Sequence, residues 1–313
     1  MEYSTLGKSD LKVSRIGLGA WQFGDKGWGW GTTVTEEDAE GILQTAFDAG
    51  INFIDTAEVY GQGISEQVVG NFIKKAGREN LVIATKVSGA HLRYGDVVKA
   101  AEASLSRLGI STIDLYQVHF PNHYVPLTQT MKAMEELIEK GAVKYIGLSN
   151  FPKPLIRDAQ EALSGHAIIS NQVRYNLLQR DIEQGILPYC RHEKIAVIAY
   201  SPLAQGLLTG KFWEPELADQ DLRKNNLLFN PINMERSKKA IDGVKQVAER
   251  YDKTPSQVAL NWLLCQDGVF PIPGAKSPSQ VADNVGAVGW RLKSEDIRLL
   301  DQFSKQTEIL YFV

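Results

Sequence analysis

The sequence predicts an α/β protein, a closed (β/α)8 TIM barrel, on three observations. Short apolar runs rich in β-branched residues alternate with helical segments, which is the pattern of βαβ units in a parallel sheet. Eight such runs follow one another without a break in composition, which favours the closed barrel over an open doubly wound sheet. The chain has 313 residues, 43% of them apolar. Length alone allows one or two domains, but the unbroken pattern predicts a single domain over residues 1–313.

The elements are expected in this order. Residues 1–15 alternate weakly around the turn cluster at residues 7–10, which predicts a short N-terminal β-hairpin that covers one end of the barrel. The barrel strands are expected at Ile16–Leu18, Asn52–Ile54, Leu81–Ala84, Ile113–Val118, Val143–Leu148, Ala167–Asn171, Ile195–Ala199 and Val269–Ile272.

Apolar stripes at helical spacing predict the outer helices between the strands. The clearest stripes are Ala39, Ile42, Leu43, Ala46 and Phe47; Val97, Val98, Ala101, Leu105 and Leu108; and Met131, Met134, Leu137 and Ile138. Thr35 with Asp38 resembles a capping box, and Gly50 and Gly141 follow their helices as expected C-caps. The stretch Leu203–Pro231, after the seventh strand, has no clear periodicity, and loops of such length are usually functional or disordered.

Charge and cysteine content exclude several classes of function. Lys and Arg total 34 against 37 Asp and Glu, a net charge of −3, so we expect neither nucleic acid nor an anionic membrane as a partner. Cys190 and Cys265 are too few and too far apart for a disulfide scaffold or a thiolate metal cluster. No signal peptide or long apolar stretch is evident, so we expect a cytoplasmic protein. No obligatory protein partner is expected either.

Four polar residues occur at the ends of consecutive predicted strands, where barrel enzymes place their catalytic groups. Asp55 follows the second strand with Tyr60 five residues later, Lys86 closes the third, and His119 closes the fourth. Taken singly, each has a purely structural interpretation: the Asp can form a turn, the Tyr can be a packing residue, and the His can be a hydrogen-bonded polar group. Together, in order after consecutive strands, they predict one common site.

These side chains suit the reduction of a carbonyl, because hydride addition leaves an alkoxide that must receive a proton. Tyr60 is the expected proton donor. Its usual pKa is about 10, and we expect the ammonium of Lys86 to lower it. Asp55 would keep Lys86 charged in a poorly solvated pocket, and a neutral His119 would orient the carbonyl.

Eight motifs occur in order along the chain: Gly17-Leu18-Gly19-Ala20-Trp21, Asp55-Thr56-Ala57-Glu58-Val59-Tyr60-Gly61, Ala84-Thr85-Lys86, Gln117-Val118-His119, Gly147-Leu148-Ser149-Asn150-Phe151, Gln172-Val173-Arg174-Tyr175-Asn176, Ala199-Tyr200-Ser201-Pro202-Leu203 and Ile272-Pro273-Gly274-Ala275-Lys276. On these motifs the chain resembles the aldo-keto reductase family over essentially its whole length, in particular bacterial and plant members related to the β subunits of potassium channels. The resemblance implies a (β/α)8 barrel, a nicotinamide cofactor across its mouth, and a catalytic tetrad of Asp55, Tyr60, Lys86 and His119.

The resemblance also implies cofactor contacts. Ser149, Asn150 and Gln172 would bind the nicotinamide carboxamide, and Tyr200 would stack on the ring. The pyrophosphate would lie along Ser201, Pro202, Leu203, Gly206 and Lys211, under a long loop that follows the seventh strand, includes Arg223 and covers the cofactor. Lys276 would meet the adenosine 2′-phosphate and Asn284 the adenine. Gly19, Ala20, Trp21, Asp55, Gly274 and Gln280 complete the expected cofactor set.

Two positions depart from a common family pattern for NADPH. Gln280 stands where many NADPH-specific members carry Arg, and Ser277 replaces a frequent basic residue, so one charge-assisted contact is missing. We expect NADPH, with NADH possible. No metal is expected, because the sequence holds no H-E-x-x-H motif. Separately, its glycine-rich stretches do not have the spacing of the common nucleotide-binding loops.

The expected substrate wall is apolar and aromatic: Trp21, Trp28, Trp30, Val59 and Phe120. Phe120 replaces a tryptophan frequent in the family. No pair of arginines is evident for an obligatory anion, so aldehydes and ketones are the expected substrates. Two alternatives remain: a cofactor-sensing binding protein resembling potassium-channel β subunits, and an NAD-dependent sugar or inositol dehydrogenase that uses the same residues.

Overall fold

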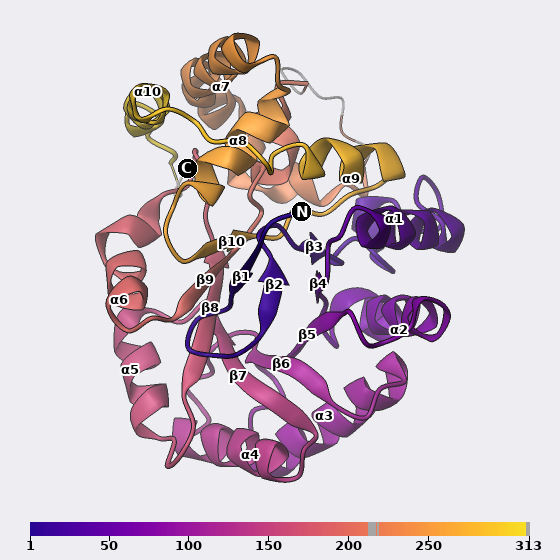
Figure 1. Ribbon diagram of the computed structural model, residues 1–313. Coiled ribbons are helices and arrows are strands. Elements are labelled where there is room, and N and C mark those ends of the chain that lie inside the picture. The colour runs from indigo at the N-terminus through magenta and orange to yellow at the C-terminus, as the bar shows by residue number, and fades with distance from the viewer. Residues whose placement is uncertain (212–216, 218, 311–313) are drawn as a thin grey trace.

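The computed structural model describes residues 1–211, 217 and 219–310, and it confirms the (β/α)8 barrel (Figure 1). Eight strands form one sheet in the order β3 to β10, and each of them pairs in parallel with its neighbour along the chain. Their bounds are β3 Leu18–Gly19, β4 Phe53–Asp55, β5 Val82–Val87, β6 Ile113–Val118, β7 Val143–Ser149, β8 Ile168–Arg174, β9 Ala196–Tyr200 and β10 Val269–Pro271.

The sheet closes where the chain around β3 meets the end of β10. The backbone N–H of Gly17 donates to Pro271 O at 3.0 Å, and that of Gly19 donates to Pro273 O at 3.1 Å. A Cβ atom on Gly17 would lie 2.8 Å from the Phe53 ring and 2.9 Å from Ile272 Cγ2. Glycine is therefore needed here, because any side chain would hold the two ends of the sheet apart.

Helices surround the strands on the outside, as Figure 1 shows. They are α1 Glu36–Asp48, α2 Ile64–Ala76, α3 Tyr94–Leu108, α4 Leu127–Glu139, α5 Lys153–Glu161, α6 Ile186–His192, α7 Pro231–Tyr251, α8 Pro255–Leu264, α9 Pro278–Val285 and α10 Ser294–Lys305. The Thr35–Asp38 capping box begins α1, and Gly50 and Gly141 follow α1 and α4 with positive φ, as predicted. Among the described residues, no helix is long and apolar enough to cross a membrane.

The predicted hairpin consists of antiparallel strands β1 (Tyr3–Thr5) and β2 (Lys12–Ser14). Leu6, Leu11 and Val13 on this hairpin are buried against Phe53, Phe270 and other side chains inside the barrel. In Figure 1 the hairpin crosses the near end of the barrel. It therefore covers the end opposite the carboxyl ends of the strands and leaves those carboxyl ends for chemistry.

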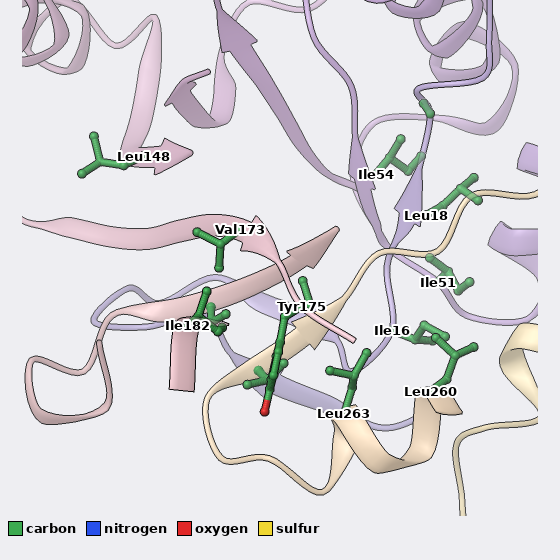
Figure 2. Close-up of a cluster of buried hydrophobic side chains, with 14 of the residues drawn as sticks. Ile16, Leu18, Ile51, Ile54, Leu148, Val173, Tyr175, Ile182, Leu260 and Leu263 are labelled. Carbon is green, nitrogen blue, oxygen red and sulfur yellow. The ribbon is translucent and has the colours of Figure 1, made fainter. Parts of the chain in front are cut away.

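Two apolar clusters stabilise the barrel. The inner one fills the hairpin end of the barrel, and the outer one packs the strands against the helices. Figure 2 shows part of the outer cluster, with Val173 on β8, Ile54 on β4, and Leu260 and Leu263 on α8. Toward the carboxyl ends of the strands the barrel interior becomes polar.

The chain after β9 forms short 3-10 turns before α7. These are η4 (Ala204–Thr209), η5 (Leu222–Asn225) and η6 (Leu227–Phe229). The predicted absence of regular periodicity between Leu203 and Pro231 is confirmed for the residues described; residues 212–216 and 218 lie outside them. Two helices, α7 and α8, then follow before β10. A regular strand–helix repeat would have one helix at this point.

Candidate active site

The four residues of the predicted tetrad meet at the carboxyl ends of β4, β5 and β6. Asp55 ends β4, His119 follows β6, and Tyr60 opens the short 3-10 turn η2 (Tyr60–Gly63). Lys86 lies inside β5, which continues to Val87, three residues past the expected end at Ala84. Ala84 and Lys86 are two residues apart on this strand, so both side chains face the barrel interior.

Lys86 joins the other members of the site. Its Nζ atom lies 2.5 Å from Asp55 Oδ1, 2.8 Å from the backbone oxygen of Thr56, and 3.2 Å from the Tyr60 hydroxyl. Lys86 is fully buried and Asp55 is 2% exposed. All three ammonium protons therefore have acceptors, which is what a buried charge requires.

The second carboxylate oxygen of Asp55 is held by two amides. Gln117 Nε2 donates to Asp55 Oδ2 at 2.9 Å, and Gln172 Nε2 donates to the same oxygen at 2.8 Å. Gln172 was expected at the nicotinamide, and that role stays a prediction. Gln117 was part of a recognised motif but had no predicted role. Its position two residues after the inward-facing Leu115 on β6 was the available signal.

The electrostatic environment differs among the three titrating groups. Burial and the nearby charge of Lys86 lower the pKa of His119 to about 3, so the imidazole is neutral at physiological pH, as predicted. Burial alone would lower the pKa of Lys86, but the Asp55 carboxylate and the Tyr60 hydroxyl more than offset it, and the pKa of Lys86 is raised.

The expected lowering of the Tyr60 pKa is wrong for this structure. Desolvation of the buried phenol raises its pKa above the usual value, and the nearby Lys86 ammonium offsets this only in part because Asp55 acts against it. The charge of Lys86 does favour the phenolate, but burial and the Asp55 carboxylate together outweigh it. Tyr60 is consequently a protonated phenol throughout the neutral range, which suits a proton donor.

Aromatic side chains surround Tyr60. His119 meets it edge to face, with ring centroids 5.6 Å apart, and Phe120 stacks on the imidazole at 5.1 Å. Trp21 lies 6.3 Å from Tyr60 and 5.2 Å from Trp28.

The remaining members of the expected substrate wall differ in their surroundings. Val59 and Phe120 are 46% and 51% exposed. Trp30 packs against Phe23, with ring centroids 6.3 Å apart, and its assignment to the substrate wall stays a prediction. Trp28 is buried, and its Nε1 atom has no hydrogen-bond partner among the described residues.

The residues expected at the nicotinamide also come together. Asn150, with a φ of +62°, follows the end of β7 at Ser149. Its Nδ2 donates to His119 O at 3.1 Å and to Ser149 Oγ at 3.0 Å, while its Oδ1 accepts from the Tyr200 hydroxyl at 3.0 Å. This arrangement ties the ends of β6, β7 and β9 into one polar edge.

A second group of expected cofactor residues lies at the start of α9 and on the loop after β9. Lys276 Nζ lies 5.2 Å from the Trp28 ring centroid. Burial and the charge of Arg223 lower the pKa of Lys276, while Asp221 acts against this. Asp221 also forms an ion pair with Arg223 at 2.6 Å. Two cations and one carboxylate thus lie near one another, and the excess of positive charge favours an anionic ligand.

The other expected contacts are placed as follows. Ser201, Pro202, Leu203 and Gly206 lie at the start of the loop after β9, with positive φ at Ser201 and Gly206, and Lys211 is exposed further along it. Gln280 accepts the backbone N–H of Lys276 at 2.8 Å, and the buried Asn284 donates to Gly274 O at 3.5 Å. The backbone N–H of Ala20 donates to Asp55 O at 2.8 Å, which places Gly19 and Ala20 beside the tetrad. No cluster of three metal-binding side chains occurs in the described ranges.

Comparisons with known proteins identify the family of this chain. The model of the Aldo/keto reductase family matches residues 15–305. The aldo-keto reductase YhdN of Bacillus subtilis is 35% identical over 98% of this chain and 95% of its own length, and an uncharacterized oxidoreductase of Mycobacterium tuberculosis is 39% identical over 91% and 87%.

Solved structures are similar over almost their whole length. The thermostable aldo-keto reductase Tm1743, crystallised with the inhibitor epalrestat, has a TM-score of 0.81 at 32% identity, over 97% of this chain and 100% of its own. The glycerol dehydrogenase AKR11B4 of Gluconobacter oxydans has a TM-score of 0.87 at 31% identity, over 99% and 97%.

Proposed function

Since this chain belongs to the aldo/keto reductase family, we propose that it is an NADPH-dependent oxidoreductase that reduces aldehydes and ketones, with Tyr60 as the proton donor. The observation that carries the proposal is the contact of Lys86 Nζ with both Asp55 and the Tyr60 hydroxyl in a buried cluster. Such a cluster can release a proton from the phenol and hold the resulting phenolate.

When bound, NADPH supplies the hydride that adds to the carbonyl carbon. The residues of this chain bind and protonate the carbonyl oxygen. The neutral imidazole of His119 holds the carbonyl oxygen by a hydrogen bond, and the Tyr60 hydroxyl gives its proton to the oxygen as negative charge develops there. Lys86 then stabilises the phenolate of Tyr60, and Asp55 keeps Lys86 charged.

The residues around the tetrad fit a nicotinamide dinucleotide. Asn150, Tyr200 and Gln172 present amide and hydroxyl groups along one edge, which suits a carboxamide. Lys276 and Arg223 supply two neighbouring cations for phosphate oxygens. We propose NADPH over NADH because Lys276 is available to a 2′-phosphate, although Gln280 is engaged with the backbone at that position.

A titration of the purified protein with NADPH and with NADH tests the cofactor assignment. We expect NADPH to quench tryptophan fluorescence at lower concentration, with a dissociation constant about tenfold lower, because one added charge contact is worth about 1.4 kcal/mol. Lys276→Met should reduce this preference while leaving NADH binding nearly unchanged. Equal affinity for the two dinucleotides in the wild-type protein would remove NADPH as the specific cofactor.

The pH dependence of turnover follows from the environments of Tyr60 and His119. Reduction needs the protonated phenol, and the raised pKa of Tyr60 keeps it protonated until the pH exceeds its usual value of about 10. His119, with a pKa of about 3, does not titrate near neutrality. We therefore expect kcat for reduction to be flat from about pH 5 to about pH 9 and to fall only above that range. A pH–rate profile with a step near pH 6.5 that disappears in His119→Gln would contradict the neutral imidazole.

The oxidative direction is a second candidate. The similar structure from Gluconobacter oxydans is named a glycerol dehydrogenase, and the similarity covers 97% of its chain. The same residues would then act in reverse, with the Tyr60 phenolate as base. Because the Tyr60 pKa is raised, oxidation should speed up as the pH rises, opposite to reduction.

We propose a small-molecule carbonyl as the partner of the site and a reducing, cytoplasmic compartment as its location. Both cysteines, Cys190 and Cys265, are free thiols, which supports the second proposal.

A further inference from the structure

A chain of buried amides crosses the barrel between β4 and β8. Gln117, fully buried on β6, lies two strands away from Asp55 on β4 and two strands away from Gln172 on β8. It contacts both: its Nε2 donates to Asp55 Oδ2 at 2.9 Å, and its Oε1 accepts from Gln172 Nε2 at 3.2 Å. Residues from strands that do not pair are thereby joined.

The space for this chain is made by a glycine on β7. A Cβ atom at Gly147 would lie 2.9 Å from Gln117 Cγ and 2.6 Å from Ser170 Oγ. Without the bare backbone at Gly147, the side chain of Gln117 could not lie across β7 toward Gln172. The sequence thus provides both the amide and the room for it.

The chain fixes the orientation of Asp55. Its Oδ1 faces Lys86, and its Oδ2 receives one N–H from Gln117 and one from Gln172. These hydrogen bonds hold the carboxylate of Asp55 in one orientation. The distance from Lys86 Nζ to the Tyr60 hydroxyl depends on that fixed carboxylate.

The chain also decides which end of Gln172 is left for a ligand. Both hydrogens of Gln172 Nε2 have acceptors, namely Asp55 Oδ2 and Gln117 Oε1. Within the described part of the chain, Gln172 Oε1 accepts no hydrogen bond, and it is not sealed from solvent. Gln172 can therefore offer a ligand only an acceptor, so the group it receives must be an N–H or O–H donor.

We propose that Gln117 is a positioning residue that acts on both halves of the reaction: it holds Asp55 against Lys86, and it turns Gln172 so that Oε1 faces the ligand. The amide of a nicotinamide carboxamide is the donor that this oxygen fits. This inference rests on the proposed function, since it assigns the catalytic acid to Tyr60 and the bound group to a nicotinamide dinucleotide.

Gln117→Met keeps the length of the side chain and removes both hydrogen bonds. We expect kcat for reduction to fall about 10- to 100-fold, the factor for losing a hydrogen bond to a charged acceptor. The dissociation constant for NADP⁺, measured by tryptophan fluorescence without any carbonyl, should rise about 3- to 10-fold, because the Gln172 amide then keeps only the hydrogen bond to Asp55 and loses the one to Gln117 that helps to orient it.

Gln117→Glu separates hydrogen bonding from packing. A protonated Glu still donates to Asp55 and accepts from Gln172, whereas an ionised one repels Asp55, and that repulsion raises its pKa above the usual value of about 4.3. We expect kcat in this variant to approach the wild-type value at low pH and to decline as the pH rises, while the wild-type profile is flat. The dissociation constant for NADP⁺ should stay closer to wild type than in Gln117→Met.

Asn261→Leu is the matched control, because Asn261 is a similarly buried amide on α8, outside the barrel interior. Its Nδ2 donates to Ala287 O and Trp290 O, and its Oδ1 accepts from the backbone N–H of Leu292 and from Cys265 Sγ. It should lower the thermal midpoint without changing either the pH profile or NADP⁺ affinity. The proposal is overturned if Gln117→Met and Gln117→Glu both keep the wild-type pH profile and NADP⁺ affinity. If wild-type protein binds no NADP⁺, the proposed function itself has failed, which is a distinguishable result.

Discussion

Tyr60→Phe should reduce turnover with NADPH and a simple aromatic aldehyde by about 100- to 10,000-fold, the range for loss of a general acid. The phenyl ring keeps its edge-to-face contact with His119 and its packing near Trp21, so the fold and the site's shape should persist. Lys86 loses one acceptor but keeps Asp55 and Thr56 O. Steady-state oxidation of NADPH, with NADPH affinity measured beside it, checks this result: affinity should be nearly unchanged.

Tyr124→Phe is the control for this substitution. Tyr124 also follows β6 but is 94% exposed, and its hydroxyl has no partner among the described residues. It should leave turnover unaltered. If Tyr60→Phe retained wild-type turnover, Tyr60 would not be the proton donor.

Lys86→Met should have an even broader effect, because it leaves the buried Asp55 carboxylate without its cation. Removing one partner of a buried ion pair costs about 3–5 kcal/mol of unfolding free energy. Turnover should fall at least about 100-fold, since no cation then stabilises the Tyr60 phenolate. Denaturant unfolding and steady-state kinetics measure the two losses.

The double variant Lys86→Met with Asp55→Asn separates the two losses. It removes the unpaired carboxylate charge at position 55, while Gln117 and Gln172 can still donate hydrogen bonds to the amide oxygen of the introduced Asn. Much of the unfolding free energy should return, but turnover should not. Recovery of turnover in the double variant would mean that the Lys86 charge has no role in the proton transfer.

The fold was predictable because each strand of the barrel is a short apolar run that is bounded by polar residues. The run Ile113–Val118 coincides with β6, and the other expected strands overlap the observed ones with shifts of a few residues at their ends. The site was predictable for a related reason: polar residues such as Asp55 and His119 end strands that all point the same way.

What the sequence could not supply depends on three-dimensional packing. The role of Gln117 requires that β6 turn this residue inward and that Gly147 on the next strand leave room for it. The direction of the Tyr60 pKa shift depends on burial, which opposes the charge of Lys86. Trp28 and Trp30 have similar glycine neighbours, and only the folded loop shows that Trp28 meets Trp21 while Trp30 meets Phe23.

The most direct test of the central claim is a single-turnover experiment. Wild-type protein and Tyr60→Phe are each loaded with less than one equivalent of NADPH, mixed with excess aromatic aldehyde, and followed by the loss of NADPH absorbance. We predict complete oxidation of the bound NADPH by the wild type and a rate about 100- to 10,000-fold lower in the variant. Bound NADPH that stays reduced in the wild type would mean a cofactor-binding protein without this chemistry, and equal rates would remove Tyr60 from the proton transfer.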